Sequence, residues 1–197
     1  MTNHELHSTQ SNVRHLHYTY GQYLEALAMS DLRLEFHDGD IFAMAGGTPE
    51  HGMLAAGLIS IISRQLPASC RVMTSDVKVR VLATGLSTFP DLSVVCGALE
   101  RAPDDQNCIT NPSLLVEVLS PSTEDYDRGE KLSHYKQLPS LQSVLFVAHD
   151  ARRITLMTRR GDEWDVVEAR DGETVVVATP PLTFAVREVF APLAPFP

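Results

Sequence analysis

The sequence predicts an α+β fold in which helices flank a central mixed β-sheet, and three observations lead to this prediction. Segments with helical capping signals are separated by short apolar, β-favouring runs, and the last third of the chain has the pattern of antiparallel strands joined by tight turns. The chain has 197 residues and contains no internal repeat or linker. We therefore expect one domain over 18–197, preceded by a disordered tail over 1–17.

Two helices are predicted in the first third of the chain. Thr19 and Gln22 have the spacing of a capping box, which predicts a helix over 20–29. Thr48 suits the N-cap and Pro49 the first turn of a second helix over 49–66. Apolar residues recur in this second helix at helical spacing and predict its buried stripe: Leu54, Leu58, Ile61, Ile62 and Leu66.

Strands are predicted on either side of the second helix. Two short apolar runs over 32–36 and 41–45 enclose Asp38-Gly39, a dipeptide typical of hairpin turns. After the helix, apolar and polar residues alternate over 71–83, which is the period of a strand. This N-terminal hairpin and the alternating strand are expected to belong to the sheet region.

The second half of the chain predicts one more helix and several strands. Asp127 and Glu130 have capping-box spacing, which predicts a helix over 127–138, and a polar loop is expected over 101–111. A buried strand is predicted over 143–149. A C-terminal antiparallel meander follows, with a last helical turn after it: 152–159, 164–169, 174–178 and 186–190.

Composition limits the classes of protein that the chain can represent. The formal charge is −9, with 25 acidic against 16 basic residues, which argues against tight nonspecific binding to nucleic acid. No apolar run reaches the roughly 20 residues that cross a bilayer, and the N-terminus lacks the apolar core of a signal peptide. The three cysteines lack ligand spacing, so we expect no disulfide framework and a reducing, cytoplasmic location.

Two apolar runs each contain one carboxylate, and this pair is the starting point for function. Asp91 lies at the start of the run 89–95, and Glu117 lies in the middle of the run 114–120. A carboxylate within a buried strand is costly unless it is paired or bound to a metal. If the two strands are adjacent, the two carboxylates can hold a hard divalent cation such as Mg²⁺ or Mn²⁺.

The order of these residues resembles the PD-(D/E)xK nuclease superfamily. Pro90-Asp91 is followed 26 residues later by Glu117. The string from Val116 to Thr123, and then Asp127-Arg128-Gly129-Glu130-Lys131-Leu132 with Tyr135, resembles one branch, the Uma-two family of restriction-endonuclease-like proteins. The similarity runs from about Tyr18 to Phe190. It implies a restriction endonuclease-like core and a metal-dependent nuclease.

One position departs from the superfamily pattern. The superfamily has Lys two residues after the second carboxylate, where this chain has Leu119. The family resemblance implies that Lys131 takes this role from the helix that follows. Asp91 and Glu117 are then the expected metal ligands, and Asp91, Glu117 and Lys131 the expected catalytic residues.

Four further residues are candidates for supporting roles: Glu50, His51, Asp76 and Arg128. The resemblance places Glu50 and His51 near the active cleft. Asp76-Val77-Lys78 also fits the (D/E)xK string, but it precedes Pro90-Asp91, so the string is interpreted as a catalytic decoy, with Asp76 expected near the site. Two roles are open for Arg128, a phosphate contact and a surface ion pair. Glu35 is expected to be an exposed strand carboxylate or to form an ion pair.

Three functions fit the sequence. The first is a metal-dependent endonuclease that hydrolyses DNA phosphodiesters, expected as a homodimer because duplex cleavage requires two cuts. The second is a non-catalytic module that binds nucleic acid or protein on a nuclease-like fold, which Leu119 and the acidic balance favour. The third is a metallohydrolase acting on a small phosphate ester.

Overall fold

The computed structural model describes residues 17–44, 46–148 and 150–193. The predicted tail over 1–17 therefore lies almost wholly outside the described residues, and its disorder stays a prediction. His17 is described, and its Nδ1 is hydrogen-bonded to the carbonyl oxygen of Asp38 at 2.9 Å. The division into a tail and one domain over 18–197 also stays a prediction.

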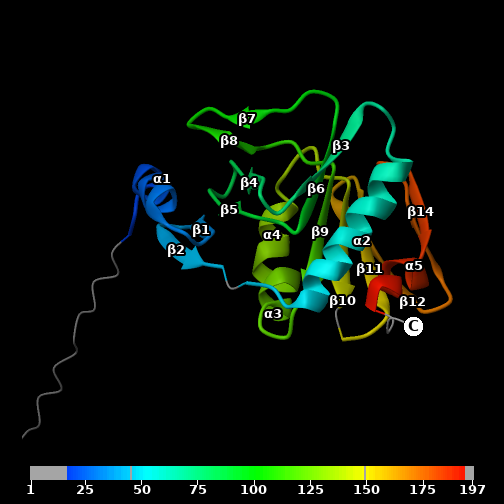
Figure 1. The fold of residues 1–197 in the computed structure, drawn as a ribbon. Coiled ribbons are helices and arrows are strands. Elements are labelled where there is room, and N and C mark those ends of the chain that lie inside the picture. The colour runs from blue at the N-terminus through cyan, green and yellow to red at the C-terminus, as the bar shows by residue number, and fades with distance from the viewer. Residues whose placement is uncertain (1–16, 45, 149, 194–197) are drawn as a thin grey trace, which may run out of the picture.

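The main sheet has six strands in the order β12-β11-β10-β9-β6-β3 (Figure 1). Neighbouring strands are antiparallel except β9 and β10, which are parallel, so the sheet is mixed. In chain order its strands are β3 (Cys70–Thr74), β6 (Leu92–Cys96), β9 (Leu114–Leu119), β10 (Ser143–Ala148), β11 (Arg153–Arg160) and β12 (Glu163–Arg170).

A second six-stranded sheet, which we call the N-terminal sheet, lies beside the main sheet in the order β2-β1-β5-β4-β8-β7. Its hairpin turn has positive φ at both Asp38 and Gly39, as the Asp-Gly dipeptide predicts. The α+β class with mixed sheets is thus confirmed, and the N-terminal sheet adds to the predicted architecture. Its strands are β1 (Leu34–His37), β2 (Asp40–Ala43), β4 (Lys78–Arg80), β5 (Ser87–Thr88), β7 (Arg101–Ala102) and β8 (Asp105–Ile109).

The helices agree closely with the capping signals in the first third of the chain. Helix α1 (Tyr20–Met29) has the predicted capping box, in which Gln22 N–H donates to Thr19 Oγ1 at 3.2 Å. Helix α2 (Pro49–Gln65) begins after its N-cap Thr48. Near the C-terminus lie α5 (Val186–Phe190) and the short 3₁₀ turn η2 (Ala191–Leu193). No helix in the described part of the chain is long and apolar enough to cross a membrane.

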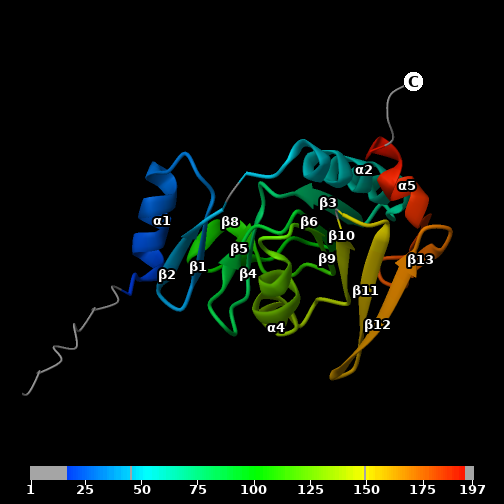
Figure 2. The same ribbon diagram turned by 90° about the horizontal axis from the view of Figure 1, so that it is seen from below.

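The main sheet is covered on both faces. Figure 2 shows α2 and α5 on one side of it and α4 (Leu132–Tyr135) on the other. Val116 and Val118 belong to the apolar cluster that includes the buried stripe of α2, whereas Leu115 and Leu119 belong to the cluster that includes α4. Since side chains alternate along a strand, Glu117 points to the same face as Leu115 and Leu119. The sheet therefore presents this carboxylate to the helix that carries Lys131.

Two strand predictions were wrong in their extent. The alternating segment 71–83 is two strands, β3 and β4, which a turn separates and which belong to different sheets. Periodicity could not reveal this break because the alternation continues through the turn. The expected loop over 101–111 contains the hairpin β7–β8, whose polar outer residues hid its strand pattern.

The helix predicted over 127–138 and the end of the meander also need correction. The helical segment 124–135 begins earlier and comprises α3 (Glu124–Tyr126), the π-helical turn η1 (Asp127–Lys131) and α4 (Leu132–Tyr135). Asp127 lies inside this segment and is buried, so it is no N-cap. The meander holds for β11 and β12, but β13 (Thr174–Val177) instead pairs with the unpredicted strand β14 (Leu182–Ala185).

Cys70 and Cys96 form a disulfide, which the sequence argument did not expect. They lie directly opposite each other on the antiparallel strands β3 and β6, with their Cα atoms 4.0 Å apart. Strand register brings them together, and residue spacing alone could not reveal that. Cys108 is a buried free thiol. The cysteines therefore give no support to a reducing compartment, and the cytoplasmic location stays a prediction.

Candidate active site

Asp91 and Glu117 occupy opposed positions on two neighbouring strands. Strands β6 and β9 are antiparallel, and Leu92 is paired with Val116. One further step in this register places Asp91 opposite Glu117, and directly opposed side chains lie on one face of a sheet. Regular pairing stops at this point. The Val118 N–H donates instead to Asp91 Oδ2 at 2.7 Å, which fixes the Asp91 carboxylate against β9.

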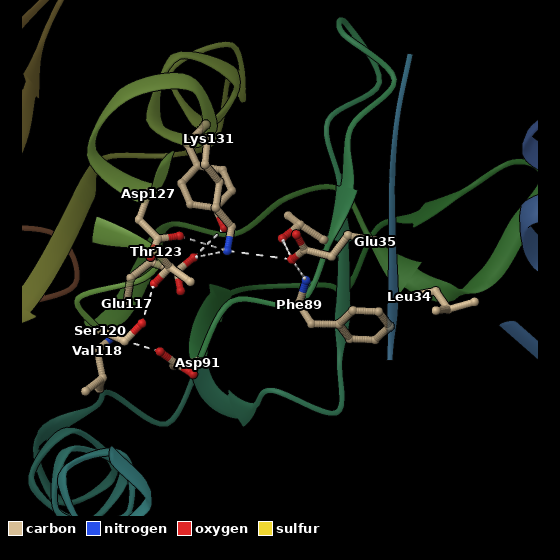
Figure 3. Close-up of polar contacts among 12 residues, drawn as sticks. Leu34, Glu35, Phe89, Asp91, Glu117, Val118, Ser120, Thr123, Asp127 and Lys131 are labelled. Carbon is tan, nitrogen blue, oxygen red and sulfur yellow. Dashed lines mark hydrogen bonds and ion pairs between the residues drawn. The ribbon is translucent and has the colours of Figure 1, made fainter. Parts of the chain in front are cut away.

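Lys131 brings an ammonium group to Glu117 from the helical segment (Figure 3). Its Nζ lies 3.0 Å from Glu117 Oε1 and 3.4 Å from Asp127 Oδ1. The side chain is buried, with a residue exposure of only 4%. Leu119, at the position of the superfamily Lys, packs in the apolar cluster beneath α4. An apolar core residue thus stands at the superfamily Lys position, and the ammonium group beside Glu117 comes from the helical segment.

The spacing of the helical segment explains why its polar side chains converge. Asp127, Lys131 and Tyr135 are four residues apart, and residues at this spacing lie on one helix face. That face is turned toward the main sheet, where Glu117 interrupts the apolar surface. The π-helical turn lies at Asp127–Lys131, within this group, and such turns occur frequently at functional sites.

Two side chains hold the carboxylates in place. The Tyr135 hydroxyl donates to Glu117 Oε1 at 2.6 Å, and this tyrosine is fully buried. On the other side, His51 Nε2 lies 3.2 Å from Asp91 Oδ2. His51 belongs to the first turn of α2, so the loop that positions Thr48 as N-cap also positions this imidazole. Each carboxylate is therefore fixed by a neighbour from a different helix.

The charges of the site are strongly coupled. Burial raises the pKa of Glu117, and the nearby Asp91 and Asp127 carboxylates raise it further against the opposing effect of Lys131. Burial alone would lower the pKa of Lys131, but the Glu117 carboxylate and its neighbours outweigh burial and raise it well above its usual value. The ammonium therefore stays charged. Extra positive charge near the carboxylates would favour the ionised form of Glu117.

The His51 imidazole responds to the same field. The hydrogen bond with Asp91 raises the pKa of His51 above its usual value, and this effect outweighs the opposing effect of burial.

Within the described part of the chain, the contacts of Asp91 involve Oδ2 and those of Glu117 involve Oε1. Oδ1 of Asp91 and Oε2 of Glu117 are therefore the oxygens that a cation can take.

Glu35 joins the site from the N-terminal sheet. Its Oε1 lies 3.7 Å from Lys131 Nζ and accepts hydrogen bonds from the Thr88 hydroxyl and from the Phe89 N–H, the latter at 3.2 Å. Glu35 forms an ion pair, one of the two expected states, but it is buried and not exposed. Its burial could not be predicted from the sequence, because the strand β5 that covers it is only two residues long.

Two of the remaining candidates form ion pairs away from the Asp91–Glu117 pair. Asp76 has a 75% exposed side chain and forms an ion pair with Arg33 at 2.5 Å, which lowers the pKa of Asp76. Arg128 forms an ion pair with Glu124 at 2.7 Å. Glu50 is exposed in the first turn of α2, one residue before His51, and its supporting role stays a prediction.

The comparisons with known proteins agree with this fold. The model of the Uma2 family, described as "putative restriction endonuclease", matches residues 20–188. The chain is 35% identical over 162 residues to the uncharacterized protein slr1290 of Synechocystis sp. (strain PCC 6803). This match covers 81% of the chain and 84% of that protein. The uncharacterized protein sll1609 of the same organism is 26% identical over 152 residues, covering 76% of the chain and 86% of that protein.

A solved structure has the same fold. It is the crystal structure of a "putative nuclease belonging to DUF820" from Anabaena variabilis, with a TM-score of 0.65 and 19% identity. The match covers 84% of this chain and 93% of the other. The architecture is thus that of a restriction endonuclease-like protein. The extent of the family match shows that the chain belongs to the Uma2 family.

Proposed function

We propose that this protein is a metal-dependent endonuclease that hydrolyses DNA phosphodiester bonds, with Asp91, Glu117 and Lys131 as its catalytic residues. The observation that carries the proposal is the placement of a second carboxylate and an ammonium group beside Glu117 of β9. Asp91 directly precedes β6, one register step beyond the Leu92–Val116 pair and so opposite Glu117, and the Lys131 ammonium lies 3.0 Å from Glu117. The family description and the nuclease fold of the Anabaena protein support the same reaction class.

The donor set fits a hard divalent cation. Asp91 and Glu117 offer carboxylate oxygens from one face of the sheet, and Mg²⁺ and Mn²⁺ prefer such ligands. We propose these two residues as the metal ligands. A bound Mg²⁺ or Mn²⁺ would supply Lewis-acid stabilisation of the phosphate charge and would make a bound water more acidic.

The protein groups around the carboxylates have distinct proposed roles. Lys131 stays protonated, so it can stabilise the negative charge that develops on the phosphate and can orient the attacking water. Tyr135 and His51 are positioning residues: each holds one carboxylate through a contact of 2.6 Å and 3.2 Å, respectively. Preorganised contacts of this kind spare the reorganisation that would otherwise accompany catalysis.

Access and assembly belong to the same proposal. The Asp91 and His51 side chains are 16% and 24% exposed, whereas Glu117 and Lys131 are almost fully buried. We therefore expect the scissile phosphate to approach along the α2 side, past His51 and Asp91.

A homodimer would supply two such sites for the two strands of a duplex. Light scattering of the purified protein measures this assembly.

A non-catalytic binding module is the second candidate. The observation that favours it is the burial of Glu117 and Lys131, which already contact each other at 3.0 Å. The net charge of −9 points the same way. Such a module would retain DNA without cutting it in Mg²⁺ or Mn²⁺.

Plasmid cleavage separates these functions. The wild-type protein is incubated with supercoiled plasmid in Mg²⁺, in Mn²⁺ and in EDTA, beside Asp91→Asn, Glu117→Gln and Lys131→Met. Asp76→Asn is the matched control because it removes an exposed carboxylate in the same way. We expect cleavage only with metal, a loss of about a hundredfold or more in the three site variants, and wild-type rates in the control. Metal-dependent cleavage retained by Asp91→Asn and Glu117→Gln would refute the assignment.

Two other outcomes favour the alternatives. Plasmid bound without cleavage by a folded wild-type protein would favour the binding module. Hydrolysis of nucleotide substrates without hydrolysis of plasmid would favour the small phosphate-ester hydrolase.

A further inference from the structure

A second cluster of metal-binding residue types lies next to the candidate active site. It comprises His37, at the end of β1, with Glu130 and His134 from the helical segment. One ligand atom from each of the three residues lies within 4.8 Å of the others. No residue of this cluster belongs to the proposed catalytic group.

One imidazole nitrogen of the cluster is buried without a hydrogen-bond partner in the described part of the chain. His37 Nδ1 lies 3.3 Å from Glu130 Oε1, and His134 Nε2 lies 4.0 Å from the same oxygen. The two imidazole rings meet edge to face with centroids 4.3 Å apart. His134 is only 9% exposed, and its Nδ1 is buried without a hydrogen-bond partner in the described part of the chain. A buried polar atom without a partner lowers the stability of the fold, so its presence calls for a functional explanation.

The sequence spacing fixes this arrangement. Glu130 and His134 are four residues apart and therefore neighbours on the helix surface, beside the face that carries Lys131. His37 is two residues after Glu35, so both side chains leave the same face of β1. Glu35 contacts Lys131 while His37 contacts Glu130. The same strand and the same helical segment thus form both clusters.

We propose that His37, Glu130 and His134 form a binding site for a transition-metal ion of the Zn²⁺ class. Two imidazoles and one carboxylate are a ligand set that Zn²⁺ accepts, with water completing the coordination. Imidazole nitrogens suit Zn²⁺ and Co²⁺ and not Mg²⁺, which prefers oxygen ligands. The half-exposed Glu130 side chain gives the ion an entry path from solvent. The site is therefore chemically distinct from the Asp91–Glu117 pair.

The consequence of binding follows from the elements that supply the ligands. A metal held by His37 and by His134 ties the hairpin β1–β2 to the helical segment 124–135. The Glu35–Lys131 ion pair joins the same two elements. Zn²⁺ should therefore slow opening of the hairpin, whether or not the protein cuts DNA. This proposal stands independently of the proposed nuclease function.

The test uses Zn²⁺ and Co²⁺ on the metal-free full-length protein. Isothermal titration with Zn²⁺ gives stoichiometry and affinity, and the visible ligand-field bands of Co²⁺ report nitrogen coordination. We expect one site per chain, with an affinity at least about tenfold weaker in His37→Ala and in His134→Gln. Hydrogen exchange should slow at residues 34–43 when Zn²⁺ is added to the wild-type protein but not to His37→Ala.

Two controls separate this site from the others. Four imidazoles lie near the N-terminus, and one of them, His17, is hydrogen-bonded to the Asp38 carbonyl. The other three, His4, His7 and His15, are the competing ligands, so the triple His→Ala variant at these positions should retain the site. Asp91→Asn should bind Zn²⁺ as the wild-type protein does, and His37→Ala should cleave plasmid in Mg²⁺ at the wild-type rate. Zn²⁺ affinity unchanged in both His37→Ala and His134→Gln, or lost in the N-terminal triple variant, would overturn the proposal.

Discussion

Glu35 and Lys131 connect the N-terminal sheet to the helical segment above the main sheet, with 3.7 Å between Oε1 and Nζ. Four further partners fix this pair. The Thr88 hydroxyl and the Phe89 N–H hold the carboxylate, and Glu117 and Asp127 hold the ammonium. Glu35 is therefore placed to position Lys131 without contacting the proposed metal ligands itself.

Glu35→Gln tests this positioning role. The amide keeps the size of the side chain but removes the charge that draws Lys131 toward the hairpin. We expect plasmid cleavage to fall about ten- to a hundredfold, because a small displacement of a catalytic group is costly. The Mn²⁺ affinity of the Asp91–Glu117 pair should stay at the wild-type value. A parallel loss of Mn²⁺ affinity would contradict a role confined to Lys131.

Tyr135→Phe tests the hydrogen bond to Glu117. Removal of the hydroxyl leaves a fully buried carboxyl group with one partner fewer, which should lower the free energy of unfolding by about 1.5–3 kcal/mol. Tyr23→Phe is a matched control, because the buried Tyr23 hydroxyl donates to the neutral carbonyl of Leu34 at 2.7 Å and should cost only about 1 kcal/mol. Urea unfolding measures both. Equal losses would show that the charge of the Glu117 site is irrelevant to this bond.

The buried pair Lys78–Asp105 predicts how stability depends on pH. The two charges are 2.6 Å apart, and both side chains are nearly fully buried. Burial raises the pKa of Asp105, but the hydrogen bonds from Lys78 and Tyr20 outweigh burial and lower it overall. A carboxyl group with a lowered folded-state pKa contributes stability above its unfolded pKa of about 3.9 and loses it as pH falls through the folded value.

Asp105→Asn should therefore destabilise the protein by about 3–5 kcal/mol at pH 7, since it leaves the Lys78 charge buried and unpaired. Urea unfolding at pH 7, 5 and 3 measures the difference from the wild-type protein. We expect the difference to be similar at pH 7 and 5 and smaller at pH 3. A difference that is unchanged at pH 3 would contradict the assigned ion pair.

The Cys70–Cys96 disulfide is open to a direct count of thiols. Protein purified without reductant and then denatured should react with thiol reagent at Cys108 alone, and after reduction at all three cysteines. The 26-residue separation predicts a contribution of about 3 kcal/mol to the free energy of unfolding in the chain-entropy account. Three reactive thiols before reduction would show that the disulfide does not form.

Local signals predicted the elements best where the local sequence determines them. The capping box at Thr19, the N-cap at Thr48 and the Asp38-Gly39 turn act within a few residues, and the structure has all three. The extents of β3, β4, β7 and β8 were wrong because strand pairing depends on distant partners. The same reason explains the unexpected disulfide, which rests on the register between β3 and β6.

The candidate site could be predicted in part for the same reason. Asp91 and Glu117 stand out as carboxylates in apolar strands, and the family resemblance pointed to Lys131. Asp127 and Tyr135 could have been found from their four-residue spacing to Lys131, but the capping-box interpretation of Asp127 concealed it. Glu35 could not be found in this way. Its burial depends on the pairing of β1 with β5 and on the contact with Lys131.

The measurement that tests the central claim most directly is a crystal of the protein soaked with Mn²⁺ and examined by anomalous scattering. The account predicts a peak within about 2.5 Å of carboxylate oxygens from both Asp91 and Glu117, with the Lys131 ammonium beside it. The peak should vanish in crystals of Asp91→Asn. Saturating Mn²⁺ that leaves this position empty, or that binds there unchanged in the variant, would contradict the account.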